Sequence, residues 1–272
     1  MGGSQGSKPE VPEELRIVLI GKTGAGKTSI MNTFLGKAAV MKNSFASDEA
    51  PCTTETAPFG NQRLVLADTL GLCHTSKSKE EVLSKIIAST FQFDSEQGPH
   101  VFLYVHSWED GFTTHDVERV KVLRRIFGKE AMRYFFLLIT HIDGDLSGGQ
   151  KNQIRKFIKK VGFKTQKYCV INNRGNENRK TKEQKELVKE INEMVENNKL
   201  RNYTKEMFEH AQEVLRKQIQ KSKTQRQMGA VDQHVATVAK ALLSPVLPAD
   251  FVTLVLQANV WLATKFDNCL TQ

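Results

Sequence analysis

The stretch LRIVLIGKTGAGKTS at residues 15–29 constrains this chain more than any other feature. Its apolar run, 15–20, predicts a buried strand, and the octet that follows fits the pattern G-x-x-x-x-G-K-[ST]. Glycines let a backbone turn tightly and point N–H groups at phosphate oxygens, while the next helix adds its positive end. The pattern therefore predicts a phosphate-binding loop made of Gly21, Thr23, Gly24, Ala25, Gly26, Lys27, Thr28 and Ser29.

A second motif closes another apolar strand. The segment LVLADTLG at residues 64–71 fits D-x-x-G, about 40 residues after the phosphate loop. At that place Asp68 is expected to reach Mg²⁺ and the Gly71 amide to contact a γ-phosphate. Thr28 is expected to give its hydroxyl to the same ion. Mg²⁺ is thus the expected cofactor, with GTP or GDP as the ligand.

A third motif is expected to bind the base of the nucleotide. The apolar run 135–139 is followed by Thr-His-Ile-Asp, where guanine-selective proteins carry [NT]-K-x-D. Asp143 is expected to accept two hydrogen bonds from guanine, a pairing that adenine cannot reciprocate. His141 stands where a lysine usually lies along the base. Asn172 and Asn173 end the next strand and are expected to reach the other edge of guanine.

The order of apolar and amphipathic runs predicts an α/β fold, a P-loop GTPase domain with a mostly parallel sheet covered by helices on both faces. A flexible tail is expected at 1–14, the GTPase domain at 15–198 and a basic helical extension at 199–272. The expected strands are 15–20, 57–60, 63–67, 101–106, 134–139 and 168–171. The expected helices are 27–35, 79–93, 114–127, 149–161, 182–197, 202–225, 230–243 and 251–266.

Charge is distributed unevenly along the chain. The net charge is +9, yet residues 146–226 alone hold 21 Lys and Arg against nine Glu. Such a span fits either a surface for anionic lipid or nucleic acid or the solvated face of amphipathic helices. Aromatic residues do not interleave with the charges, so no nucleic-acid partner is expected. Four dispersed cysteines suit a reducing compartment and a cytoplasmic protein.

The end of the chain carries two membrane signals. Cys269 is the fourth residue from the end, which meets the C-a-a-X pattern for a lipid anchor, although coincidence explains it as well. The run 251–263 is too short to span a bilayer. It fits docking on the GTPase domain or interfacial contact, so peripheral association with an intracellular membrane is an open expectation.

Together these residues resemble the GIMAP or AIG-type GTPases, the septin-like GTPases of immunity-associated proteins. The resemblance covers residues 15–198 and rests on GKTGAGKTS, on LVLADTLGL and on the block from Val101 to Leu146. It implies a threonine before residue 57 as a ligand of Mg²⁺ and γ-phosphate, with Thr53 preferred over Thr54. It also implies a first switch at 38–56, a second at 69–79, and homo-oligomers formed through the nucleotide face.

The chain departs from related GTPases at the residues that support hydrolysis. Leu72 occupies the place of a water-orienting glutamine, and the box at residues 108–113 contains no arginine. Hydrolysis is therefore expected to be slow or to depend on a partner, with His74 or Glu109 as open candidates. A guanine-nucleotide switch that self-associates with GTP is the main interpretation. A GTP-dependent scaffold without turnover and a P-loop ATPase or kinase are the alternatives.

Overall fold

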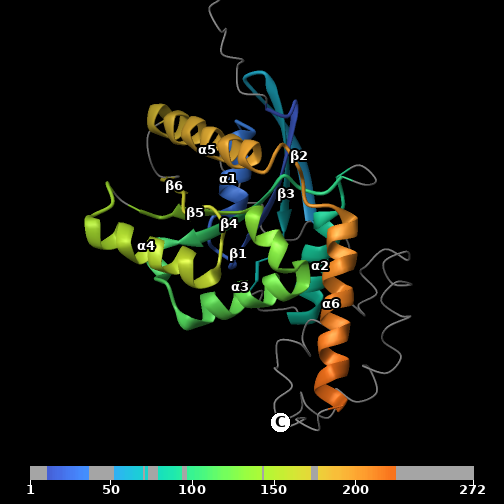
Figure 1. Ribbon diagram of the computed structural model, residues 1–272. Helices are drawn as coiled ribbons and strands as arrows, with labels where there is room; N and C mark the ends of the chain where they lie inside the picture. Colours follow the sequence, from blue (N-terminus) through green and yellow to red (C-terminus); the bar gives the residue numbers. More distant parts are fainter. Residues whose placement is uncertain are drawn as a thin grey trace, which may run out of the picture.

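The computed structural model describes residues 11–36, 52–69, 71–72, 79–93, 97–142, 144–172 and 177–224. A six-stranded sheet with the order β2-β3-β1-β4-β5-β6 forms its centre (Figure 1). Only β2, at the edge, runs antiparallel among these strands. The strands are β1 Glu14–Gly21, β2 Cys52–Phe59, β3 Gln62–Thr69, β4 Val101–Ser107, β5 Phe135–Thr140 and β6 Tyr168–Ile171.

Helices cover both faces of this sheet, as the predicted α/β fold requires. One face carries α1 and α5, and the other carries α2, α3 and α4, with α6 outside them against α3 (Figure 1). Their bounds are α1 Lys27–Phe34, α2 Lys79–Thr90, α3 Thr114–Phe127, α4 Gly148–Val161, α5 Glu177–Asn197 and α6 Lys205–Thr224, with short 3-10 turns η1 Trp108–Asp110 and η2 Lys129–Arg133.

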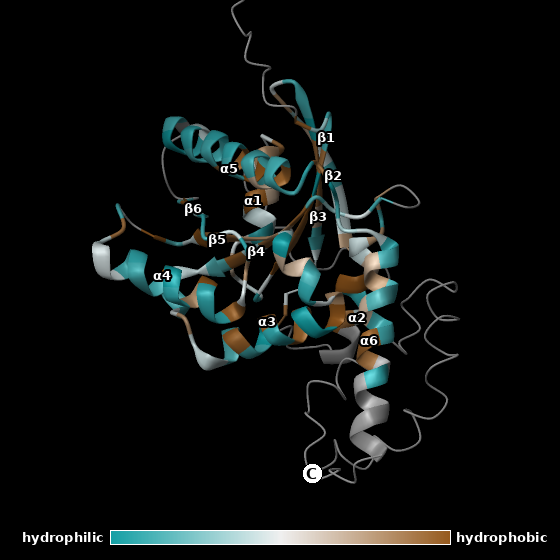
Figure 2. Cartoon of the chain, viewed as in Figure 1, coloured by the Kyte–Doolittle hydropathy of each residue, from teal (hydrophilic) through white to brown (hydrophobic). Residues whose placement is uncertain are grey.

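The hydrophobic core lies in two layers separated by the sheet. Continuous apolar strands such as β4 and β5 are buried on both sides, which is the pattern of a parallel sheet sandwiched by helices. Helix α6 belongs to the layer that α2, α3 and α4 form with the sheet, because Phe208 packs against Phe91 and Phe127. The ring centroids lie 5.4 and 6.1 Å apart. Figure 2 shows this as hydrophobic colour on α2 and on the adjoining side of α6. The domain boundary drawn at residue 198 stays a prediction.

Local signals in the sequence explain where α3 begins and ends. The Thr113 side chain accepts from the Asp116 N–H, and the Asp116 carboxylate accepts from the Thr113 N–H at 2.8 Å. This is a capping box, which satisfies N–H groups that the first turn leaves without partners. Gly128 ends the helix with a φ of 84°, a conformation that glycine adopts without strain.

One strand differs from the sequence expectation. The short strand expected at 57–60 is β2, which extends back to Cys52 and pairs with the full length of β3. Residues 52–56 therefore lie in a strand, although they were assigned to the first switch loop. The rest of that loop lies outside the described residues, as do the helices expected at 230–243 and 251–266 and the C-terminal Cys269.

Candidate nucleotide-binding site

The phosphate loop connects β1 to α1 in the way that its sequence predicts. Gly24 and Gly26 have φ values of 82° and 93°, which residues with a side chain rarely adopt. A Cβ atom on Gly21 would lie 2.2 Å from the Val105 carbonyl oxygen of the neighbouring strand. Only glycine fits these three positions, so the loop can pass close to β4 and turn its N–H groups toward a ligand.

The lysine of this loop is held near the backbone that precedes it. The Lys27 ammonium donates to the carbonyl oxygens of Gly21, at 3.1 Å, and of Lys22, at 3.0 Å. The residue is buried, with 6% of its surface exposed. Its charge therefore sits inside the curve of the loop, beside the first turn of α1, where the helix end also favours an anion.

Thr28 and Asp68 meet at the candidate metal position. The Thr28 hydroxyl donates to the Asp68 carboxylate at 2.5 Å, although the two residues are 40 positions apart in the sequence. The other carboxylate oxygen of Asp68 is buried and has no hydrogen-bond partner among the described residues. Burial raises the pKa of Asp68, against the opposing effects of the Thr28 hydrogen bond and the Lys27 charge. A buried carboxylate oxygen without a hydrogen-bond partner is suited to bind a cation, or a water molecule that a cation holds.

These two oxygen donors suit Mg²⁺ bound together with phosphates. Among the described residues, no group of three or more His, Cys, Asp or Glu side chains forms a metal cage. Mg²⁺ in nucleotide sites usually takes only one or two protein ligands and completes its shell with water and phosphate oxygens. The Thr28–Asp68 pair therefore fits the expected group without a third carboxylate.

The strand β2 brings the two candidate threonines to different environments. Thr53 is exposed and lies in register with Asp68 across the β2–β3 ladder. Side chains of residues directly opposite in such a ladder lie on the same face of the sheet. Thr54 is also exposed, but its hydroxyl is 3.4 Å from the side-chain oxygen of Gln92, two residues after the end of α2. This geometry favours Thr53, and its role as a metal ligand remains a proposal.

The second motif packs directly onto the phosphate loop. A Cβ atom on Gly71 would lie 2.2 Å from the Thr23 hydroxyl and 2.5 Å from its amide nitrogen. The next residue, Leu72, donates its N–H to the Gly21 carbonyl at 3.0 Å and packs against the core. Glycine at position 71 thus permits a contact that any side chain would block. Residues 73–78, including His74, lie outside the described part.

Thr140 joins the base motif to the phosphate loop. Its hydroxyl is fully buried and donates to the Ala25 carbonyl at 2.8 Å, while its oxygen lies 3.0 Å from His141 Nδ1. His141 itself has a φ of 54°, which is uncommon for a residue with a side chain and turns the chain sharply after β5. Asp143, the expected base-reading residue, lies outside the described residues. Sequence reasoning assigned Thr140 no role.

A small polar network organises the fourth element of the site. The Asn172 N–H donates to the Glu183 carboxylate at 2.8 Å, and the Arg179 guanidinium donates to the same carboxylate at 2.7 Å. Arg179 also reaches the Gly144 carbonyl, at 3.5 Å, in the loop after β5. Glu183 and Arg179 thus link the two segments expected to hold the base, and the sequence reasoning missed both. Their i, i+4 spacing at the start of α5 was the available signal. Asn173 lies outside the described residues.

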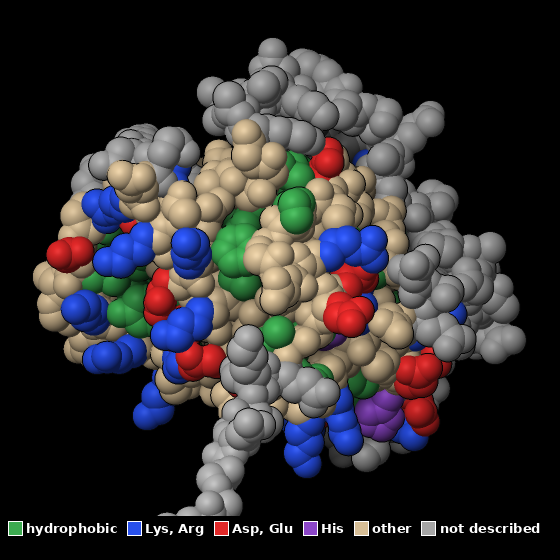
Figure 3. Space-filling model, turned by 90° about the horizontal axis from the view of Figure 1, so that it is seen from above, with side chains coloured by type: hydrophobic (Ala, Val, Ile, Leu, Met, Phe, Trp, Pro, Cys, Tyr) green, Lys and Arg blue, Asp and Glu red, His purple; other side chains and the backbone are tan. Residues whose placement is uncertain are grey.

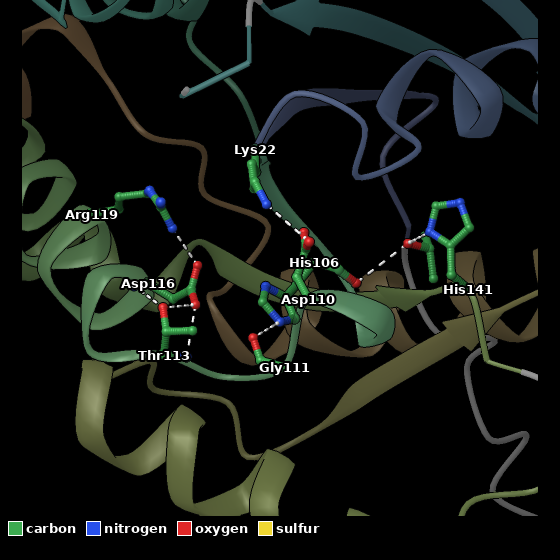
Figure 4. Close-up of polar contacts among 9 residues, drawn as sticks. Lys22, His106, Asp110, Gly111, Thr113, Asp116, Arg119 and His141 are labelled. Carbon is green, nitrogen blue, oxygen red and sulfur yellow. Dashed lines mark hydrogen bonds and ion pairs between the residues drawn. The ribbon is translucent and has the colours of Figure 1, made fainter. Parts of the chain in front are cut away.

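The box after β4 contacts both the phosphate loop and α4. Lys22 of the loop pairs with Asp110 at 2.9 Å, and His106 Nε2 donates to the Gly111 carbonyl at 3.1 Å (Figure 4). The His106 ring stacks on Phe112 with centroids 4.5 Å apart, and Phe112 stacks on Phe157 of α4 at the same distance. Burial lowers the pKa of His106, so the ring is held neutral. These contacts fix the box beside the candidate site.

The helices in the described ranges bear on the expected membrane contact. None of those helices is long and apolar enough to cross a membrane.

Comparison with known proteins places this site in a family context. The AIG1 family model matches residues 15–223. GTPase IMAP family member 8 of Rattus norvegicus is 28% identical over 183 residues, which are 64% of this chain and 25% of that protein. Immune-associated nucleotide-binding protein 3 of Arabidopsis thaliana is 32% identical over 126 residues, 46% of this chain and 37% of that protein. The chain thus spans only about a quarter to two fifths of the length of these relatives.

A solved structure supports the same fold. Toc33 from Arabidopsis thaliana, in complex with GDP and Mg²⁺, superposes with a TM-score of 0.54 at 20% identity. The match covers 71% of this chain and 88% of the Toc33 chain. At this level of identity the likeness establishes the P-loop α/β fold alone.

Proposed function

The chain belongs to the AIG1 family, and from that premise we propose that it is a guanine-nucleotide-binding switch that uses Mg²⁺. The observation that carries the proposal is the Thr28–Asp68 pair at 2.5 Å, next to the buried Lys27. Lys27 and the loop amides would bind the phosphates, and Thr28, Asp68 and Thr53 would hold the metal. When bound, Mg²⁺ would neutralise charge on the phosphate oxygens.

Guanine is the base that this site is proposed to select. Asp143 would accept from the guanine N1–H and N2–H₂ groups, with His141 along the ring and Asn172 and Asn173 at the other edge. The proposal draws support from the Thr140–Ala25 bond, which joins the end of β5 to the phosphate loop, and from the Arg179–Gly144 bond, which joins the start of α5 to the loop after β5. It is also in line with the relatives, one of which is named a GTPase and another a nucleotide-binding protein.

We further propose that the GTP-bound form self-associates through the nucleotide face and hydrolyses GTP slowly or with a partner's help. Slow hydrolysis has local support, because Leu72 is apolar and packs against the core, so its side chain cannot orient water. The box held by Lys22 and His106 contains no arginine. The same observations favour a second candidate, a scaffold that binds GTP without meaningful turnover, and a turnover assay separates the two.

The test is to identify the bound nucleotide and to measure particle size. We expect GDP and GTP to bind in the presence of Mg²⁺, ATP not to compete, and a non-hydrolysable GTP analogue to increase the sedimentation coefficient over GDP. Lys27→Ala should abolish binding because it removes the phosphate-facing charge, and Asp143→Asn should shift preference toward xanthine nucleotides. Lys217→Ala, on α6, is the matched control for the loss of one lysine.

Two outcomes would contradict these proposals at different levels. Equal competition by ATP would exclude guanine selection and favour the ATPase or kinase alternative. Identical sedimentation with both nucleotides at high protein concentration would remove self-association, while leaving nucleotide binding intact.

A further inference from the structure

Among the described helices that carry several cations, α4 alone has charges of one sign. It exposes five cations, Lys151, Arg155, Lys156, Lys159 and Lys160, and contains no Asp or Glu. None of these five forms an ion pair with any part of the chain that the structure describes. Lys159 and Lys160 lie in the last turn, where the helix end favours cations, but the five like charges repel one another, so helix stability does not explain the arrangement as a whole.

The other basic helices balance their cations with acids. Lys121 of α3 pairs with Glu118 at 2.6 Å, Arg179 of α5 with Glu183 at 2.7 Å, and Lys217 of α6 with Glu213 at 2.6 Å. Figure 3 looks onto the face that carries α5 and shows basic and acidic side chains next to one another. A surface that mixes both signs of charge is sufficient to keep a helix hydrated. The exclusively positive charge of α4 therefore needs another explanation than exposure to solvent.

The five cations occupy the half of α4 that faces away from the core. At 100° per residue, their positions cover an arc of about 180° on the helix surface. The buried residues Ile154, Phe157, Ile158 and Val161 fill the opposite arc and pack into the core. The result is a cationic face about 14 Å long from Lys151 to Lys160. Arg124 of α3 lies beside its C-terminal end, 3.3 Å from where a Cβ on Gly162 would be.

We propose that this α4 face docks on an anionic membrane surface by electrostatic attraction, without inserting side chains into the bilayer. Every large apolar side chain of α4 is buried, so the contact relies on charge alone. Four of the five cations are lysines, which act as point charges suited to lipid headgroups, whereas arginine forks are preferred in nucleic-acid recognition. The exposed face also lacks the aromatic side chains on which bases stack.

The size of the effect follows from the number of charges. Each basic residue near an anionic leaflet contributes about fivefold to membrane partitioning, and the attraction is screened within about 8 Å at physiological salt. The triple variant Lys156→Gln/Lys159→Gln/Lys160→Gln should therefore weaken binding to anionic vesicles by roughly 100-fold. The matched control, Lys182→Gln/Lys185→Gln/Lys189→Gln, removes the same charge from the balanced helix α5 and should retain most of the binding.

The experiment is co-sedimentation of the full chain with vesicles of phosphatidylcholine, alone or mixed with phosphatidylserine, at low and physiological ionic strength. The phosphatidylcholine arm measures any contribution of other segments, and the proposal concerns the additional binding to phosphatidylserine. Equal losses in both triple variants would show a general effect of net charge and overturn the proposal. No extra binding to phosphatidylserine, or tighter binding to a DNA duplex at the same salt, would overturn it as well.

Discussion

At the scale of single residues, Asp68 combines a cost in stability with a proposed function. One of its carboxylate oxygens is buried without a hydrogen-bond partner among the described residues, and burial raises its pKa. Because the folded state binds this proton more tightly than the unfolded state, ionisation at neutral pH lowers the free energy of unfolding. The residue is therefore better suited to holding a cation than to stabilising the ligand-free protein.

We expect Asp68→Asn to separate these two effects. The free energy of unfolding of the ligand-free protein should rise by about 1 kcal/mol or stay unchanged, because a buried charge is removed while the shape is kept. The affinity for GTP in the presence of Mg²⁺ should fall by about tenfold or more, and its dependence on Mg²⁺ should become weaker. Thermal unfolding without ligand and nucleotide titrations with and without Mg²⁺ measure both. Asp145→Asn, at an exposed position, is the control, and a strongly destabilised Asp68→Asn would contradict the argument.

At the scale of elements, the box and α3 meet at the Thr113–Asp116 cap. Thr113→Ala removes the side chain that accepts from the Asp116 N–H and should lower the free energy of unfolding by about 1 kcal/mol. Burial alone would raise the pKa of Asp116, but its hydrogen bonds with Thr113 and the nearby Arg119 guanidinium lower it overall. The Asp116 carboxylate thus stabilises the fold at pH values above the pKa that it has in the unfolded chain. This stabilisation is lost as the pH falls through the lower pKa that it has in the folded protein.

Urea denaturation at neutral and acidic pH tests this cap. The difference in the free energy of unfolding between the unmodified protein and Thr113→Ala should be smaller at acidic pH than at neutral pH. The exposed neighbour Thr114, replaced by Ala, should change stability by less than about 0.5 kcal/mol. A Thr113→Ala effect as small as that of the control would show that the cap contributes little.

Most elements were predictable because their patterns are local. Continuous apolar runs mark β1, β4 and β5, and the Thr113 and Gly128 signals mark the ends of α3. The extension of β2 to Cys52 was missed because CTTET has no apolar alternation, and only the ladder with β3 holds it extended. The Thr140–Ala25 and Lys22–Asp110 contacts join segments 115 and 88 residues apart, so no local pattern announces them.

At the scale of the whole molecule, the segment 97–100 connects β1 of the sheet to the residues that precede α6. The Arg16 N–H donates to His100 Nδ1 at 3.1 Å, and the Arg16 guanidinium donates to the Gly98 carbonyl at 2.9 Å. On the other side, the Tyr203 N–H donates to the Pro99 carbonyl at 2.9 Å. Burial, and to a lesser degree the Arg16 charge, lowers the pKa of His100 to about 3.

Acid should therefore destabilise the whole fold through His100. Between about pH 6.5 and 3 the unfolded chain binds a proton at this residue that the folded chain excludes, so stability falls as pH falls through that window. The expected loss at pH 4.5 is on the order of 2 kcal/mol. His100→Gln should flatten this dependence in urea denaturation series across the window. His210→Gln, at an exposed position on α6, should leave the slope unchanged, and equal slopes in all three proteins would rule His100 out.

The buried Thr140 hydroxyl has a consequence for how a nucleotide would be held. Its hydrogen bond to the Ala25 carbonyl connects the phosphate loop rigidly to the end of β5, the strand that precedes the residues proposed to bind the base. Two fragments of the ligand, guanosine and pyrophosphate, would then bind independently of each other, because neither has to order the surface that the other needs. The intact nucleotide would gain more affinity than the sum of its parts.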